Sequence, residues 1–109
     1  MSYKIHRASG SGAISETIAP VKPWELEGLR LHLDAGGADS NLTVTIDSGV
    51  NSKHNTVLLT LGMNGETDQD YRWSPTQKFT HKNDKVIIEY TNGGSATWGL
   101  EIIYKTLGG

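Results

Sequence analysis

The sequence contains no cysteine and only three prolines. Without cysteine the chain can form neither disulfides nor thiolate metal sites, which is typical of a protein assembled in a reducing compartment. It also lacks any apolar run near the ~18 residues that a membrane-spanning helix requires. Its first residues lack the apolar core of a signal peptide. The sequence therefore predicts a protein that has no disulfides and does not span a membrane.

Acidic side chains are absent from residues 1–12, MSYKIHRASGSG, which carry Lys4, His6 and Arg7. Residues 13–109 hold eight Lys and Arg against twelve Asp and Glu, a net charge of −4. Two fixed positive charges on the first segment give little affinity for phosphates, so we expect no nucleic-acid partner. We predict that residues 1–12 form a flexible arm that becomes ordered on a partner, and that residues 13–109 form a single domain.

Apolar and polar residues alternate along most of the chain, which is the pattern of β-strands. The clearest case is residues 42–46, where apolar residues alternate with threonines. In residues 24–33 the alternation slips at Glu27 and Gly28, and one extra residue there indicates a β-bulge. The same pattern marks further candidate strands at residues 14–18, 57–63, 71–73, 86–90 and 98–104, with a short run around Phe79.

These segments amount to about eight short strands with no convincing amphipathic helix between them. Short strands at this spacing predict an all-β fold, an antiparallel β-sandwich of jelly-roll or Greek-key type with an extended N-terminal arm. Strand pairing is not visible in one sequence, so both strand orders remain open.

No catalytic motif accompanies this pattern. A hydrolase needs an activated serine beside a histidine and an orienting acid. Ser9 and Ser11 fall in the predicted arm, and the candidate bases His32, His54 and His81 lie far apart with no motif around them. We therefore expect no enzymatic activity and no cofactor.

Residues 61–75, LGMNGETDQDYRWSP, concentrate acidic side chains. Asp68 and Asp70 are candidate calcium ligands because carboxylate oxygens suit that ion, although their spacing does not match an EF-hand loop. The interpretation we favour is a solvated loop whose acids end one strand and discourage edge pairing. We predict no metal site, with Asp68 and Asp70 as the alternative.

The aromatic residues suggest a contact surface. Trp24 and Trp98 share a phase with leucines and isoleucines and are expected in the core. Tyr71 and Trp73 flank Arg72 next to acidic residues, so we expect them to be partly exposed. Large rings beside an arginine are enriched at protein–protein interfaces. Exposed rings that stack on sugars would be the alternative use of this pair.

Four segments carry a resemblance to known proteins: WELEGLRLHLDA, NLTVTIDSG, TVLLTLGMNGETDQDYRW and ATWGLEIIYK. Over about residues 20–105 they resemble small β-sandwich virion proteins of tailed bacteriophages, of the capsid decoration (cement) or head–tail accessory type. The resemblance implies a non-enzymatic structural protein that binds the outer shell and stabilises contacts between capsomers. It implies assembly in the bacterial cytoplasm and a place on the capsid surface.

The resemblance also implies partners, namely the major capsid protein or neighbouring virion subunits. It favours a homo-oligomer, for which a trimer would suit a jelly roll at a three-fold position. Strand addition would anchor the arm, and its basic residues would meet an acidic subunit surface. The alternative is a carbohydrate- or receptor-binding module of a tail or head accessory protein. The residues predicted to contact a partner are Tyr3, Lys4, Ile5, Arg7, Tyr71, Arg72 and Trp73.

Overall fold

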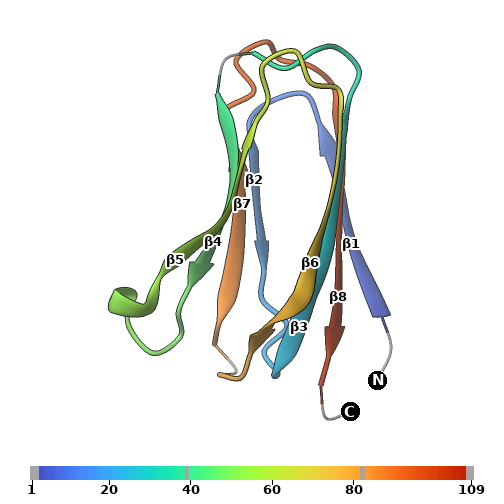
Figure 1. Cartoon of the computed structure of the whole chain (residues 1–109). Coiled ribbons are helices and arrows are strands. Elements are labelled where there is room, and N and C mark those ends of the chain that lie inside the picture. The colour runs from blue at the N-terminus through green and yellow to red at the C-terminus, as the bar shows by residue number, and fades with distance from the viewer. Residues whose placement is uncertain (1–2, 39, 82, 108–109) are drawn as a thin grey trace.

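A computed structural model describes residues 3–38, 40–81 and 83–107. Within them, eight strands form two antiparallel sheets that face each other (Figure 1), and the one helix is a short 3-10 turn. This turn is too short to cross a membrane, and the described residues hold no longer helix. The elements are β1 (Tyr3–Gly10), β2 (Ile14–Ile18), β3 (Trp24–Leu33), β4 (Asn41–Asp47), η1 (Ser52–His54), β5 (Thr56–Gly62), β6 (Asp68–Phe79), β7 (Lys85–Tyr90) and β8 (Trp98–Thr106).

The strand order is that of a jelly roll. Sheet A has the order β1-β8-β3-β6, and sheet B has the order β2-β7-β4-β5. The chain crosses between the sheets at every connection except the β4–β5 hairpin, which projects from the sandwich with η1 at its tip (Figure 1). The predicted all-β antiparallel sandwich is confirmed, and of the two orders left open the structure adopts the jelly roll.

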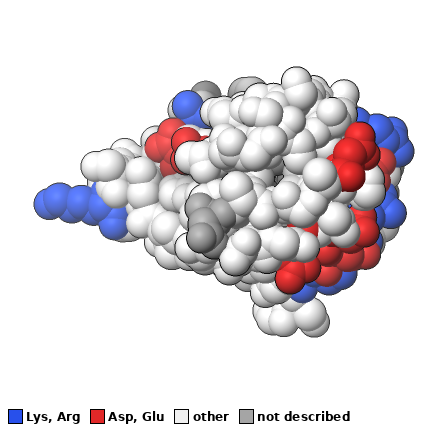
Figure 2. All heavy atoms as spheres, turned by 90° about the horizontal axis from the view of Figure 1, so that it is seen from above, with Lys and Arg blue, Asp and Glu red and all other residues white. Residues whose placement is uncertain are grey.

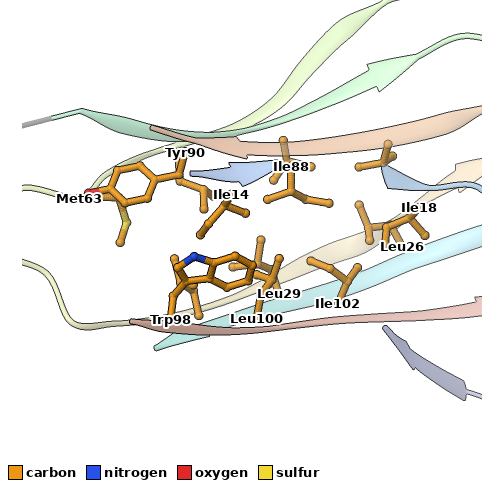
Figure 3. Packing of buried hydrophobic residues seen from close by; sticks show 14 of the residues in the cluster. Ile14, Ile18, Leu26, Leu29, Met63, Ile88, Tyr90, Trp98, Leu100 and Ile102 are labelled. Carbon is orange, nitrogen blue, oxygen red and sulfur yellow. The ribbon is translucent and has the colours of Figure 1, made fainter. Parts of the chain in front are cut away.

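The core lies between the two sheets because alternate side chains of each strand point inward. Ile88 of sheet B faces Leu29 and Leu100 of sheet A, and all three are almost fully buried (Figure 3). Trp24 stacks on Phe79 with ring centroids 4.5 Å apart and closes one end of the core. Trp24 and Trp98 are buried, as their phase predicts.

The predicted bulge in β3 is present. Leu26 pairs with Tyr104 while Gly28 pairs with Ile103, so Glu27 is the extra residue. A Cβ on Gly28 would lie 2.7 Å from the Arg72 Cδ, so the arginine stem passes directly over the glycine. The same Cβ would lie 2.9 Å from the Tyr71 carbonyl oxygen, and the bulge favours glycine because this backbone atom cannot move aside as an arginine side chain can.

The predicted flexible arm is wrong for its described residues, since residues 3–10 form β1 and pair with β8 along the whole strand. Small inward side chains make this possible. A Cβ on Gly10 would lie 3.2 Å from the Trp98 ring, so the glycine lets that indole pack closely without a shift. Beyond the strand, the Trp98 Nε1 donates to the Gly12 carbonyl at 2.9 Å. Residues 1–2 of the predicted arm lie outside the described residues.

Asn92 fixes the loop end of the sandwich. It is buried, and its φ of 52° is a left-handed conformation that asparagine tolerates better than most residues. Its Nδ2 donates to the carbonyls of Gly12 and Ala96, both at 2.9 Å, and its Oδ1 accepts from the Ala96 N–H. One side chain thus joins the β1–β2 loop to the β7–β8 loop.

Replacing Asn92 with alanine should lower the free energy of unfolding by about 2–4 kcal/mol, because it leaves buried backbone groups without partners and disfavours the positive φ. Denaturant unfolding measures the change. Asn92→Gly loses the same hydrogen bonds but accepts the backbone angle, so it should cost less than the alanine variant. A change below about 0.5 kcal/mol for Asn92→Ala would contradict this role.

Deleting residues 1–10 should destabilise the sandwich by more than about 3 kcal/mol, since it uncovers β8 and the Trp98 ring. Thermal unfolding followed by circular dichroism tests this. Tyr3→Ala, which keeps the β1–β8 ladder, should cost no more than about 1 kcal/mol. A truncated chain that melts at the temperature of the full chain would restore the interpretation of this segment as a detached arm.

Candidate functional site

The outer face of sheet A carries a row of alternating charges, which we call the charge row. Residues paired across antiparallel strands share a face, and the pairing aligns Arg7, Glu101, Arg30 and Asp70 from β1, β8, β3 and β6. The Arg7 Nε lies 2.6 Å from one Glu101 oxygen, and the Arg30 Nη2 lies 2.9 Å from the other. Figure 2 shows acidic and basic atoms interleaved on this side of the molecule.

Glu101 is the central anion of the charge row. The hydrogen bond from Arg7, followed by the charges of Arg30 and Arg7, holds the pKa of its carboxyl below the usual value. At the edge of the row, Asp70 accepts from the Arg72 Nε at 3.0 Å. The row is therefore ionised at neutral pH, and its charges are largely balanced within the face.

A second polar group lies on the same face, two residues further along β3, where His32 lies between two carboxylates. Its Nδ1 is 2.6 Å from Asp68 and its Nε2 is 3.1 Å from Asp34. The hydrogen bond to Asp68 is the largest cause that raises the pKa of His32, and the same bond lowers the pKa of Asp68. The two carboxylates thus favour the charged imidazole, in which both ring nitrogens donate.

A shallow depression of about 740 Å³ lies between the charge row and His32. Gly99 forms part of its lining, and a Cβ there would meet nothing within 4 Å. No aromatic side chain of the described residues lines the depression. The charged side chains around it are Arg7, Arg30, His32, Asp68, Asp70 and Glu101.

The structure places all seven predicted contact residues on β1 and β6, the two open edges of sheet A. On β1, Tyr3 is 63% exposed and Ile5 is 39% exposed. Tyr3 also lies under the Lys105 ammonium, 5.0 Å from the ring centroid. Lys4 and Arg7 are exposed on the same strand.

The expected exposure of the Tyr71 and Trp73 pair is wrong for Trp73. The ring of Trp73 is buried at 6% exposure, and Tyr71 is half-buried against it with ring centroids 5.0 Å apart. Both side chains point inward because they alternate with Asp70 and Arg72, which occupy the outer face. The polar neighbours that suggested exposure are the outward-facing residues of the same strand.

The candidate calcium ligands lie on a strand rather than in the predicted loop, since β6 begins at Asp68. Asp68 bonds His32 and Asp70 bonds Arg72, so each carboxylate faces a cation of the chain itself. Over residues 3–38, 40–81 and 83–107, no three His, Cys, Asp or Glu side chains gather as a metal would require.

Sequence reasoning missed the charge row and the paired His32. The signal available was the polar series Arg30, His32 and Asp34 on the outer phase of β3. Their partners come from β1, β6 and β8, which the register alone brings together. Ser9 lies in the row of His32 but with β8 between them, about 9–10 Å away, which is beyond hydrogen-bond reach.

No protein-family description matches the sequence, and no curated protein matches it. Among solved structures, a chain in the structure of infectious bursal disease virus, Gx strain, is similar at 14% identity and a TM-score of 0.36. The match covers 98% of this chain and 33% of that chain, so this chain spans about a third of its length. This likeness to a virus protein is weak, and it specifies neither a family nor a function.

The pKa of His32 should lie above its ordinary value in the folded protein and fall in Asp68→Asn. Asp34→Asn should lower it less, because Asp68 makes the stronger hydrogen bond. A group whose pKa rises on folding stabilises the fold below its unfolded pKa and loses that effect as pH rises through the folded pKa. The His32–Asp68 pair therefore contributes between the ordinary carboxyl and imidazole pKa values, and less at high salt.

Titration of the imidazole protons by NMR tests this, with Asp47→Asn as a distant control. A His32 pKa that is the same in the wild type and in Asp68→Asn would show that the pair does not form in solution.

Proposed function

We propose that this chain is a non-enzymatic structural protein of a virus particle, specifically a capsid decoration protein of a tailed bacteriophage. It would bind the outer shell beside the major capsid protein and stabilise contacts between capsomers. Support comes from the four segments that resemble such proteins and from the jelly-roll architecture, which is common in capsid proteins but also occurs in lectins and enzymes.

The observation that carries the proposal is the arrangement of the predicted contact residues. They lie along the open edges of one sheet, where unpaired backbone groups are available for strand addition. On β1 the exposed Tyr3 and Ile5 share the outer face with Arg7, and the exposed Lys4 lies between them on the other phase. Such an edge suits contact with an extended acidic partner rather than enclosure of a small substrate.

The charged groups of sheet A favour the same interpretation. Arg7 and Arg30 both pair with Glu101, and His32 is held by Asp68. Groups committed to each other in this way maintain a solvated surface and do not provide a free base or nucleophile. We therefore keep the proposal that the chain is not an enzyme.

The location of β1 changes the mechanism expected from the sequence. Because β1 is part of sheet A, the contact to the shell would be made by its open edge and exposed side chains, without a detached arm. The projecting β4–β5 hairpin offers a second contact, since Val50 and Val57 are 60% and 55% exposed there. Two separated contact regions would let one subunit join two capsomers.

The ring pair that suggested glycan binding is not available on the surface. Trp73 is buried and Tyr71 is half-buried, so together they form no exposed platform for a sugar. A glycan array with the wild-type chain would still detect such binding.

Co-sedimentation with shells of the major capsid protein encoded in the same genome tests the proposal. The wild-type chain should bind and should raise the temperature at which the shells rupture. Lys4→Glu should lower binding at least about fivefold, because it reverses a charge at the contact. Lys22→Glu, the same charge change on an exposed residue between β2 and β3, is the matched control. Folded chain that stays in the supernatant would refute the decoration role.

A further inference from the structure

The two open edges of sheet A carry opposite charge. The β1 edge presents Lys4 and Arg7, in a segment without a single acidic residue. In residues 68–72 the β6 edge presents Asp68 and Asp70, whose side chains are 74% and 60% exposed, against one basic residue, Arg72. The edges are therefore complementary to each other.

The directions of the strands also match. Neighbouring strands of sheet A are antiparallel throughout, so β1 and β6, at the ends of a four-stranded sheet, run in opposite directions. A second copy placed beside the first in the same orientation would bring its β6 antiparallel to β1. Apart from the rotation that the twist of the sheet imposes, no reversal of strand direction is needed for the ladder to continue.

The hydrogen-bonding pattern matches as well. Along any row of an antiparallel sheet, hydrogen-bonded and non-hydrogen-bonded pairs alternate from one strand to the next. Sheet A has four strands, so the first and the last of its three strand pairs are of the same type in any row. The free backbone groups of Arg7 and Asp70, which share a row, are therefore both oriented for a pair of the other type, as the alternation requires. The row can therefore be repeated without a shift of register.

We propose that β1 of one copy pairs with β6 of a second copy, residues 5–9 against residues 68–72, with Arg7 opposite Asp70. The joint extends sheet A and the charge row from copy to copy, so that Arg7 lies between its own Glu101 and Asp70 of the second copy. The inference goes beyond the proposed function because the joint requires no shell and no other protein.

Charge also selects this joint over the symmetric ones. Pairing β1 with β1 would bring Lys4, His6 and Arg7 of both copies together, and pairing β6 with β6 would oppose Asp68 and Asp70. Like charges directly opposite each other on a sheet are destabilising. The joint is therefore heterologous, and it leaves one edge of each kind open in a dimer, so association continues into a ring or a filament.

The absence of cysteine allows a direct test. Ser9 and Asp68 share a row but lie on opposite edges of the sheet, three strand spacings or about 14 Å apart, which is too far for a disulfide within one copy. Full-length Ser9→Cys and Asp68→Cys variants, mixed under mild oxidation at up to about 1 mM, should form a mixed disulfide dimer. Ser9→Cys mixed with Lys78→Cys, which is on the same strand and face but in another row, is the matched control.

A charge cycle tests the central pair. Adding Asp70→Lys to the Asp68→Cys chain should lower the yield of mixed dimer about two- to fivefold, whereas adding Glu66→Lys, the same charge change on an exposed loop residue, should not. Adding Arg7→Glu to the Ser9→Cys chain should restore the yield with Asp70→Lys. Rescue by the second reversal distinguishes a contact between copies from damage to either fold.

The joint is refuted if the Ser9→Cys and Asp68→Cys pair yields no more mixed dimer than the Lys78→Cys control while circular dichroism shows folded chains. It is equally refuted if a wild-type chain under light scattering stops at a dimer of symmetric type, with Ser9→Cys cross-linking to itself. Because these measurements contain no shells, their failure leaves the decoration role intact, and a failure of shell binding leaves the joint intact. The joint occupies the β1 edge of every copy but the last in a row, so joined copies would contact a shell through the projecting β4–β5 hairpin and the exposed side chains of β1.

Discussion

The pairing of β3 with β8 is the contact on which the rest of the structure depends. These strands lie far apart in the sequence, yet they form the centre of sheet A, with β6 beside one and β1 beside the other. Their inward side chains, among them Leu29 and Leu100, supply one wall of the core. Their outward side chains place Arg30 against Glu101. A single ladder therefore determines both the interior and the charged exterior.

The sequence predicts those parts of the fold in which each strand carries its own apolar face. The slip at Glu27 and Gly28 locates the bulge because two phases of burial meet there. β1 escapes the same reasoning because its inward positions hold His6, Ala8 and Gly10, which are small or polar. The strand is stabilised by its pairing with β8 and by packing against the Trp98 ring. Neither interaction leaves a pattern in the sequence of residues 3–10.

The contact residues and the charges show a different limit. The residues predicted to contact a partner fall on the two edge strands of sheet A, but the exposure expected for Trp73 was wrong because an acidic neighbourhood was taken as a sign of exposure. The charge row could not be foreseen at all, since its four members come from four strands and only the register aligns them. The sequence specifies each side chain, whereas the neighbours of that side chain depend on non-local strand pairing.

The side-by-side arrangement of β1 and β8 has a mechanical consequence. Tyr3 pairs with Lys105, so the chain enters and leaves sheet A at neighbouring points of one end. Tension applied between these points would peel β1 from β8 one residue pair at a time, in a zipper geometry that offers little resistance. Tension applied along the length of a ladder must instead shear all of its hydrogen bonds together. A load passed through the lateral contacts acts across the strands and is shared by all hydrogen bonds of a ladder, whereas a load on the ends of the chain falls on one residue pair at a time.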